Sequence, residues 1–137
     1  MFTLTKEFLF EASHVLPHHS GKCSRMHGHS WKFAVEIRGG VLRRGGSNHG
    51  MLMDYGVISA AVKPIVEDLL DHRHLNDVEG IGYPTSERIA EWLFFKVRDA
   101  LPADTREMLH AITVNETCTC ACRYEQPKEE PADAEQA

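Results

Sequence analysis

Three histidines stand where two consecutive strands would meet, and together they could bind a metal ion. His14 ends one alternating stretch, and His27 and His29 begin the next. Residues two apart share a strand face, so an antiparallel hairpin would bring the three imidazoles to one end of one face. Three neutral imidazoles with an open fourth position are typical of a catalytic zinc site, although copper, nickel and iron also accept nitrogen ligands. The alternative is three unrelated histidines, each with its own hydrogen bond.

Three further residues could transfer protons beside such a metal. Cys23 lies between the two stretches, and a nearby dication would stabilise its thiolate. The alternative is an unreactive loop cysteine. Asp71 precedes His72, and a carboxylate beside an imidazole favours general acid or base behaviour near neutral pH. Because such a pair is also common at an exposed helix end, its interpretation depends on the other candidates.

Glu116 is a candidate for binding a ligand. It shares a strand face with Ile112 and Val114, so alternation points its side chain inward. A buried carboxylate is costly unless it is paired, and the sequence nearby suggests no basic partner. A ligand with a guanidine-like edge would satisfy it through two parallel hydrogen bonds. The alternative is a glutamate at the strand end that turns into solvent.

The hydrophobic periodicity predicts the elements that position these residues. Alternation predicts two N-terminal strands, and apolar residues then recur at helical spacing from Val57 to Leu70, with a kink or an offset helix start expected at Pro64. A second helix follows a Thr85 or Ser86 cap, and two short strands close the domain. The order β-β-α-α-β-β predicts an α+β fold, with a four-stranded antiparallel sheet and two helices on one face. We expect one domain over residues 1–125 and a disordered acidic tail over 126–137.

Composition excludes several classes of protein. The net charge is −5, but residues 125–137 carry five acidic residues and one lysine, so the rest is nearly neutral and gives no support for nucleic-acid binding. No segment approaches the roughly 20 apolar residues of a membrane span. The charged, alternating N-terminus differs from a signal peptide, so we expect a cytoplasmic protein.

The four cysteines are expected to be thiols rather than a disulfide framework. Besides Cys23 they are Cys118, Cys120 and Cys122. Their C-x-C-x-C spacing could bind a soft metal, but ordinary turn residues are the simpler interpretation.

Five motifs in this order resemble one enzyme family. FEASH, CSRMHGH, LDHRHLN, PTSE and NETCT, spread from about residue 2 to about residue 125, are similar to the 6-pyruvoyl-tetrahydropterin synthase / 6-carboxy-tetrahydropterin synthase family. The resemblance implies the T-fold, in which subunits join their sheets into trimers or hexamers with active sites between them. It implies roles for nine residues: Zn²⁺ on His14, His27 and His29, catalysis by Cys23 and by Asp71 and His72 of a neighbouring subunit, and a pterin edge held by Glu116, Thr85 and Ser86.

The short spacing from Cys23 to His27 resembles the queuosine-pathway members of this family. That resemblance implies conversion of 7,8-dihydroneopterin triphosphate to 6-carboxy-5,6,7,8-tetrahydropterin, acetaldehyde and triphosphate. The alternatives are a 6-pyruvoyl-tetrahydropterin synthase and a non-catalytic zinc- or pterin-binding protein. Lys22, Arg25 and Arg73 are candidates to hold the triphosphate, and Arg73–His74 departs from the commoner family pattern.

Overall fold

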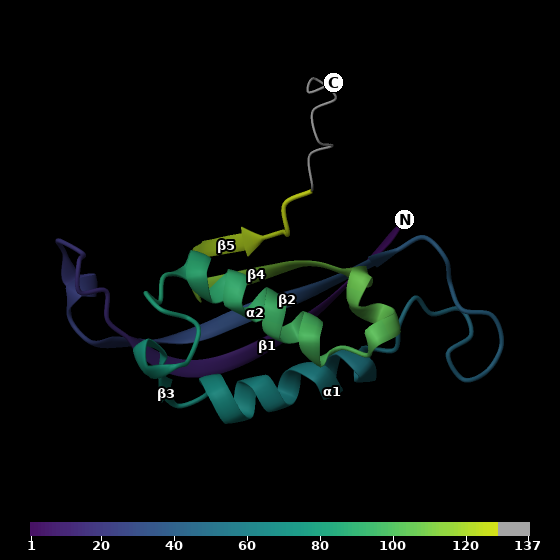
Figure 1. The fold of residues 1–137 in the computed structure, drawn as a ribbon, viewed down its shortest axis with the longest axis horizontal. Helices are drawn as coiled ribbons and strands as arrows, with labels where there is room; N and C mark the ends of the chain where they lie inside the picture. Colours follow the sequence, from purple (N-terminus) through teal and green to yellow (C-terminus); the bar gives the residue numbers. More distant parts are fainter. Residues whose placement is uncertain (129–137) are drawn as a thin grey trace, which may run out of the picture.

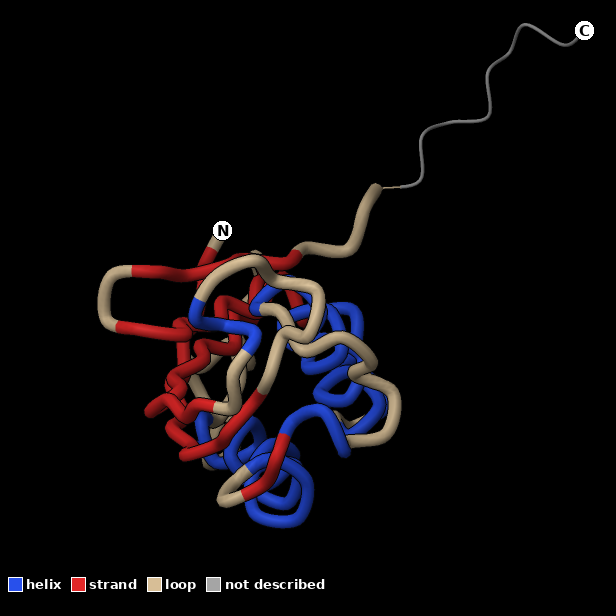
Figure 2. Tube along the Cα trace, turned by 90° about the vertical axis from the view of Figure 1, so that its left-hand side faces the viewer, coloured by secondary structure: helices blue, strands red, loops and turns tan. Residues whose placement is uncertain are grey.

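A computed structural model describes residues 1–128. One five-stranded sheet, in the order β3-β1-β2-β4-β5, packs against two helices (Figure 1). Figure 2, turned by 90°, shows the helices gathered on one side of the strands. The strands are β1 (Phe2–His14), β2 (His27–Gly39), β3 (Arg73–His74), β4 (Leu109–Thr117) and β5 (Cys120–Tyr124), and the helices are α1 (Tyr55–Ile65) and α2 (Ser86–Ala100).

The long β1–β2 hairpin confirms the expected pairing of the first two strands. Its register is unbroken from Phe2 opposite Gly39 to His14 opposite His27. Alternate residues of both strands are buried beneath the helices, among them Phe10, Trp31 and Phe33, whereas Glu7, Leu9 and Glu11 are exposed on the other face. This parity places His14, His27 and His29 on the helix-covered face, at the end where the strands leave for the loop.

Both helices begin at polar caps. The Asp54 side chain accepts a hydrogen bond from the Gly56 amide at the start of α1, and Thr85 accepts one from Arg88 at the start of α2. Thr85 is therefore the cap residue, one of the two predicted possibilities. Pro64 lies in the last turn of α1, and the chain continues as a wider π-helical turn over Val66–Leu70. A kink or an offset start was expected at Pro64; the irregularity that the structure shows is this change of helix type, which begins two residues later.

The predicted count of four strands is wrong. A fifth strand, β3, pairs in parallel with Ala12 and Ser13 on the outer edge of β1. Two residues are too few to show an alternating pattern, so periodicity could not reveal it. The strand follows directly after Asp71 and His72 and holds that pair against the sheet edge.

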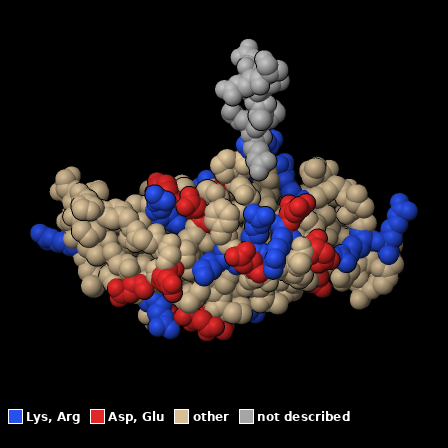
Figure 3. All heavy atoms as spheres, in the orientation of Figure 1, with Lys and Arg blue, Asp and Glu red and all other residues tan. Residues whose placement is uncertain are grey.

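The described chain bears on three other expectations. Its four cysteines are free thiols, as expected. Of the tail predicted at 126–137, residues 129–137 lie outside the described residues. Within the described part, no helix is long and apolar enough to cross a membrane. Acidic and basic side chains are interspersed on the face drawn in Figure 3, in keeping with the nearly neutral charge of the domain.

Candidate metal centre

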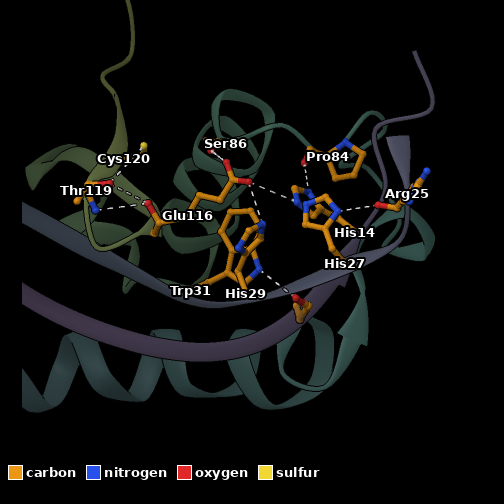
Figure 4. Close-up of polar contacts among 12 residues, drawn as sticks. His14, Arg25, His27, His29, Trp31, Pro84, Ser86, Glu116, Thr119 and Cys120 are labelled. Atoms are coloured by element: carbon orange, nitrogen blue, oxygen red, sulfur yellow. Dashed lines mark hydrogen bonds and ion pairs between the residues drawn. The ribbon is translucent and has the colours of Figure 1, made fainter. Parts of the chain in front are cut away.

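The three predicted histidines converge at the open end of the β1–β2 hairpin. The ring centroids of His14 and His27 are 4.4 Å apart, and those of His27 and His29 are 4.8 Å apart. With Glu116 they form a group whose potential ligand atoms all lie within 4.8 Å of one another (Figure 4). Trp31, fully buried, lies beneath the rings of His14 and His29. The histidine cluster therefore packs edge-to-face against a buried aromatic ring.

Backbone carbonyls set the orientation of two of these rings. The His14 Nδ1 lies 2.9 Å from the Pro84 carbonyl oxygen, and the His27 Nδ1 lies 2.7 Å from that of Arg25. A carbonyl oxygen only accepts hydrogen bonds, so each Nδ1 carries the proton and donates. The Nε2 atoms of both rings therefore keep their lone pairs free. An outer hydrogen bond of this kind fixes the tautomer and aim of metal-binding histidines.

The burial of the cluster fits a bound cation. Nε2 of His14 and Nε2 of His29 are buried, and neither makes a hydrogen bond within the described residues. Desolvation by burial lowers the pKa of His14; the nearby His27 and His29 act in the same direction, and the Pro84 carbonyl and Glu116 oppose them. His14 is therefore neutral at neutral pH, as a metal ligand must be. The nearby Glu116 carboxylate has no proton to donate to an unprotonated Nε2, whereas a metal ion would satisfy these buried nitrogens.

Glu116 points into the cluster from β4. Its Oε1 lies 3.0 Å from His29 Nε2 and 3.5 Å from His14 Nε2, and its Oε2 accepts a hydrogen bond of 3.1 Å from the Ser86 hydroxyl. Two histidines reach Glu116 because β2 pairs with β4, which joins segments far apart in the sequence.

Glu116 lies at a local irregularity of the β4–β5 pairing. The β4–β5 register shifts between Asn115 and Thr117, which leaves Glu116 without a partner on β5. An extra residue of this kind bends a strand and redirects its side chain. The side chain is 25% exposed, so an incoming ligand can reach the carboxylate.

The hydroxyl groups of Ser86 and Thr85, at the start of α2, make different contacts. The Ser86 hydroxyl contacts Glu116 within the site, as described above, whereas the Thr85 hydroxyl accepts a hydrogen bond of 3.3 Å from the Arg88 amide as the helix cap. Of these two predicted ligand-binding residues, the structure brings Ser86 to the carboxylate.

Asp71 and His72 lie together on the outer edge of β1. The His72 Nδ1 is 2.9 Å from Asp71 Oδ2, the Glu11 amide donates to Asp71 Oδ1, and the His72 amide donates to the Glu11 carbonyl. The Glu11 amide contributes most, and His72 further, to holding the pKa of Asp71 below its usual range. These contacts also hold His72 at a φ of 58°, an uncommon value for a residue with a side chain. The His72 side chain is 80% exposed.

Within the same chain, His72 and His29 line one open cavity, but the pair is not bonded to the histidine cluster. No hydrogen bond or ion pair within residues 1–128 connects Asp71 or His72 to the three predicted metal ligands. Cys23, the third predicted proton-transfer residue, lies half-buried in a single 3-10 turn over Lys22–Ser24. In one chain the three histidines and Glu116 are therefore together, whereas Asp71 and His72 lie at the outer edge of β1.

The soft-metal alternative for the other cysteines is not supported. Cys118 and Cys120 are exposed near the β4–β5 turn, while Cys122 is half-buried against the core. Among the described residues, the group with metal-binding geometry contains none of them. Burial, and secondarily the negative charge of Glu87, raises the pKa of the Cys122 thiol, which disfavours the thiolate that metals bind.

An α+β fold, with a histidine–carboxylate group at the end of the sheet that could hold a metal ion, places this chain in the T-fold class. Residues 3–127 match the 6-pyruvoyl tetrahydropterin synthase family, and the chain belongs to that family. It is 47% identical over 132 residues to a 6-carboxy-5,6,7,8-tetrahydropterin synthase of Synechocystis sp., covering 96% of this chain and 98% of that protein. The enzyme of the same name from Haemophilus influenzae is 30% identical, over 92% of this chain and 100% of that protein.

The fold comparison agrees with the sequence comparison. The structure of Caenorhabditis elegans 6-pyruvoyl tetrahydropterin synthase superimposes with a TM-score of 0.80 at 26% identity, covering 92% of this chain and 96% of that one. The predicted family and the predicted T-fold are both confirmed.

Proposed function

We propose that this chain is a 6-carboxy-5,6,7,8-tetrahydropterin synthase. It would convert 7,8-dihydroneopterin triphosphate and water to 6-carboxy-5,6,7,8-tetrahydropterin, acetaldehyde and triphosphate. The observation that carries the proposal is the Glu116 carboxylate beside three metal-competent histidines, with Oε1 3.0 Å from His29 Nε2. This pairing suits a substrate with a guanidine-like edge near a side chain rich in oxygen. The names of the Synechocystis and Haemophilus relatives support the choice of reaction.

We further propose Zn²⁺ as the metal, held by Nε2 of His14, Nε2 of His29 and a ring nitrogen of His27. When bound, it would supply a Lewis acid for the oxygens of the substrate side chain. Glu116 would accept two hydrogen bonds from the pyrimidine edge of the pterin. The Ser86 hydroxyl would hold the carboxylate in place, and Thr85 would contribute through the helix start that it caps.

Proton transfer is assigned to Cys23, Asp71 and His72. The Asp71–His72 pair is exposed on a sheet edge, which supports its action in the site of a neighbouring subunit. The short edge strands β3 and β5 could pair with other chains, as a trimer or hexamer of joined sheets requires. Lys22, Arg25 and Arg73 are proposed to contact the triphosphate. The four free thiols support a reducing compartment, and we propose the cytoplasm.

Product analysis tests the proposed reaction. The purified protein, incubated with 7,8-dihydroneopterin triphosphate, should yield 6-carboxy-tetrahydropterin by mass spectrometry and an equal amount of trapped acetaldehyde. A 6-pyruvoyl product without acetaldehyde would assign the chain to the other synthase activity of the family. Pterin binding without turnover would make it a binding protein.

A further inference from the structure

The segment between β1 and β2, residues 15–26, carries Cys23 and is closed on itself by backbone hydrogen bonds. The Leu16 amide donates to the Cys23 carbonyl at 2.7 Å, and the His19 amide donates to the Leu16 carbonyl at 2.9 Å. The position of Cys23 is therefore linked to that of the whole loop. Any contact that ties this loop to the body of the domain also affects where the thiol lies.

Besides His27, whose Nδ1 donates to the Arg25 carbonyl at the end of the loop, two side chains in the described part of the chain hold this loop by hydrogen bonds. At the base of the loop, the Asn76 amide group bonds both backbone groups of Val15, at 2.9 and 2.8 Å. In the middle of the loop, the Tyr83 hydroxyl accepts a hydrogen bond of 3.0 Å from the His18 amide. The rings of His18 and Tyr83 also stack, with centroids 5.4 Å apart and planes 19° from parallel.

Tyr83 is itself well fixed to the metal centre. It is the residue before Pro84, whose carbonyl orients His14, and its own carbonyl accepts a hydrogen bond from the Thr85 amide at the start of α2. Ser86, which contacts Glu116, follows directly. Residues 83–86 therefore contact the thiol-bearing loop, one predicted metal ligand and the carboxylate in turn.

We propose that Tyr83 is a positioning residue that fixes Cys23 relative to the metal centre through the hydrogen bond of its hydroxyl to the His18 amide. The catalytic consequence rests on the proposed function, in which Cys23 transfers a proton. Small displacements of a reacting group can greatly slow its reaction. Because Tyr83 holds the loop without contacting substrate, it affects turnover more than substrate binding. Sequence motifs did not single out Tyr83.

The test compares Tyr83→Phe, which keeps the ring but removes the hydroxyl, with Tyr55→Phe as a matched control. Tyr55 is 52% exposed at the start of α1. Three quantities are measured in the full-length protein: hydrogen exchange at the His18 amide, the alkylation rate of Cys23 by iodoacetamide followed by mass spectrometry, and bound metal. Losing one hydrogen bond in Tyr83→Phe should speed exchange and alkylation roughly fivefold, with metal content unchanged. Tyr55→Phe should match the wild type.

Kinetics add a measurement that a merely structural role would not affect. Tyr83→Phe should lower kcat roughly three- to tenfold and leave KM within about twofold. Unchanged exchange and alkylation in Tyr83→Phe, equal changes in Tyr55→Phe, or loss of metal would each overturn the proposal, as would faster alkylation with an unchanged kcat. If the wild type has no pterin activity, the proposed function fails, and the exchange and alkylation rates still decide whether Tyr83 fixes the thiol.

Discussion

Replacing Glu116 by glutamine separates pterin recognition from metal binding. The proposed pterin edge presents two N–H donors, and the carboxylate offers two acceptor oxygens. A glutamine side chain keeps one acceptor but places an NH₂ group opposite a donor. The three histidines remain in Glu116→Gln, so the variant should retain its metal while binding the pterin more weakly.

The structure bounds the size of this effect. A hydrogen bond to a charged group contributes about 1.5–3 kcal/mol, and the 25% exposure of the Glu116 side chain favours the lower part of that range. The dissociation constant should therefore rise roughly 10- to 40-fold. The matched control is Ser86→Ala, which removes one neutral donor to the same carboxylate and should cost less than roughly tenfold.

Fluorescence titration with 6-carboxypterin, and with 6-carboxylumazine, which lacks the 2-amino group, provides the assay. The wild type should prefer the pterin, and Glu116→Gln should lose most of that preference. Equal preference in the two proteins would refute the assignment of Glu116 to the pterin edge. Metal and pterin lost together would instead show that Glu116 acts through the metal.

Four further predictions concern the metal, the thiol, pH and assembly. His29→Ala should lose most of the metal measured by atomic absorption yet keep its circular dichroism spectrum; full retention of metal would contradict the ligand assignment. Cys23→Ala should keep metal and pterin affinity but lose turnover by at least roughly a hundredfold, and normal turnover would transfer its role to His72. Because burial lowers the pKa of His14 below its ordinary 6.5, the unfolded chain binds the proton more readily, so the metal-free protein should lose stability as pH falls below about 6.5; a melting temperature independent of pH between 5 and 7 would argue against this. Light scattering should give a trimer or hexamer at micromolar concentration, and a strict monomer would contradict an active site shared between subunits.

The sequence was most informative about which residues share one face of a strand. Two alternating stretches were enough to predict that His14, His27 and His29 share a face, because side chains alternate strictly along a strand. The hydrophobic spacing and polar caps likewise predicted both helices. The family resemblance added the T-fold, which periodicity alone could not distinguish from other two-layer arrangements.

Contacts made by backbone groups, and contacts between distant segments, were beyond prediction from spacing. Every residue has a carbonyl group, so nothing in the sequence marks that of Pro84 as the acceptor for His14. The closeness of Glu116 to His29 depends on β2–β4 pairing and a local loss of register. The proposed action of Asp71 and His72 in a neighbouring subunit rests on the family resemblance, because no pattern within one chain describes a second chain.

The unbroken β1–β2 register makes the metal centre sensitive to changes in length at some positions and tolerant at others. Deleting one residue in the middle of β1, for example Leu9, would place His14 on the opposite face of the sheet from His27 and His29. The strand could restore His14 only by shifting its register, which would expose its apolar side chains. Adding residues to the loop at 15–26 changes no parity in either strand. Length variation among relatives of this chain should therefore be concentrated in that loop, where it can change the reach of the thiol while all three ligands stay in place.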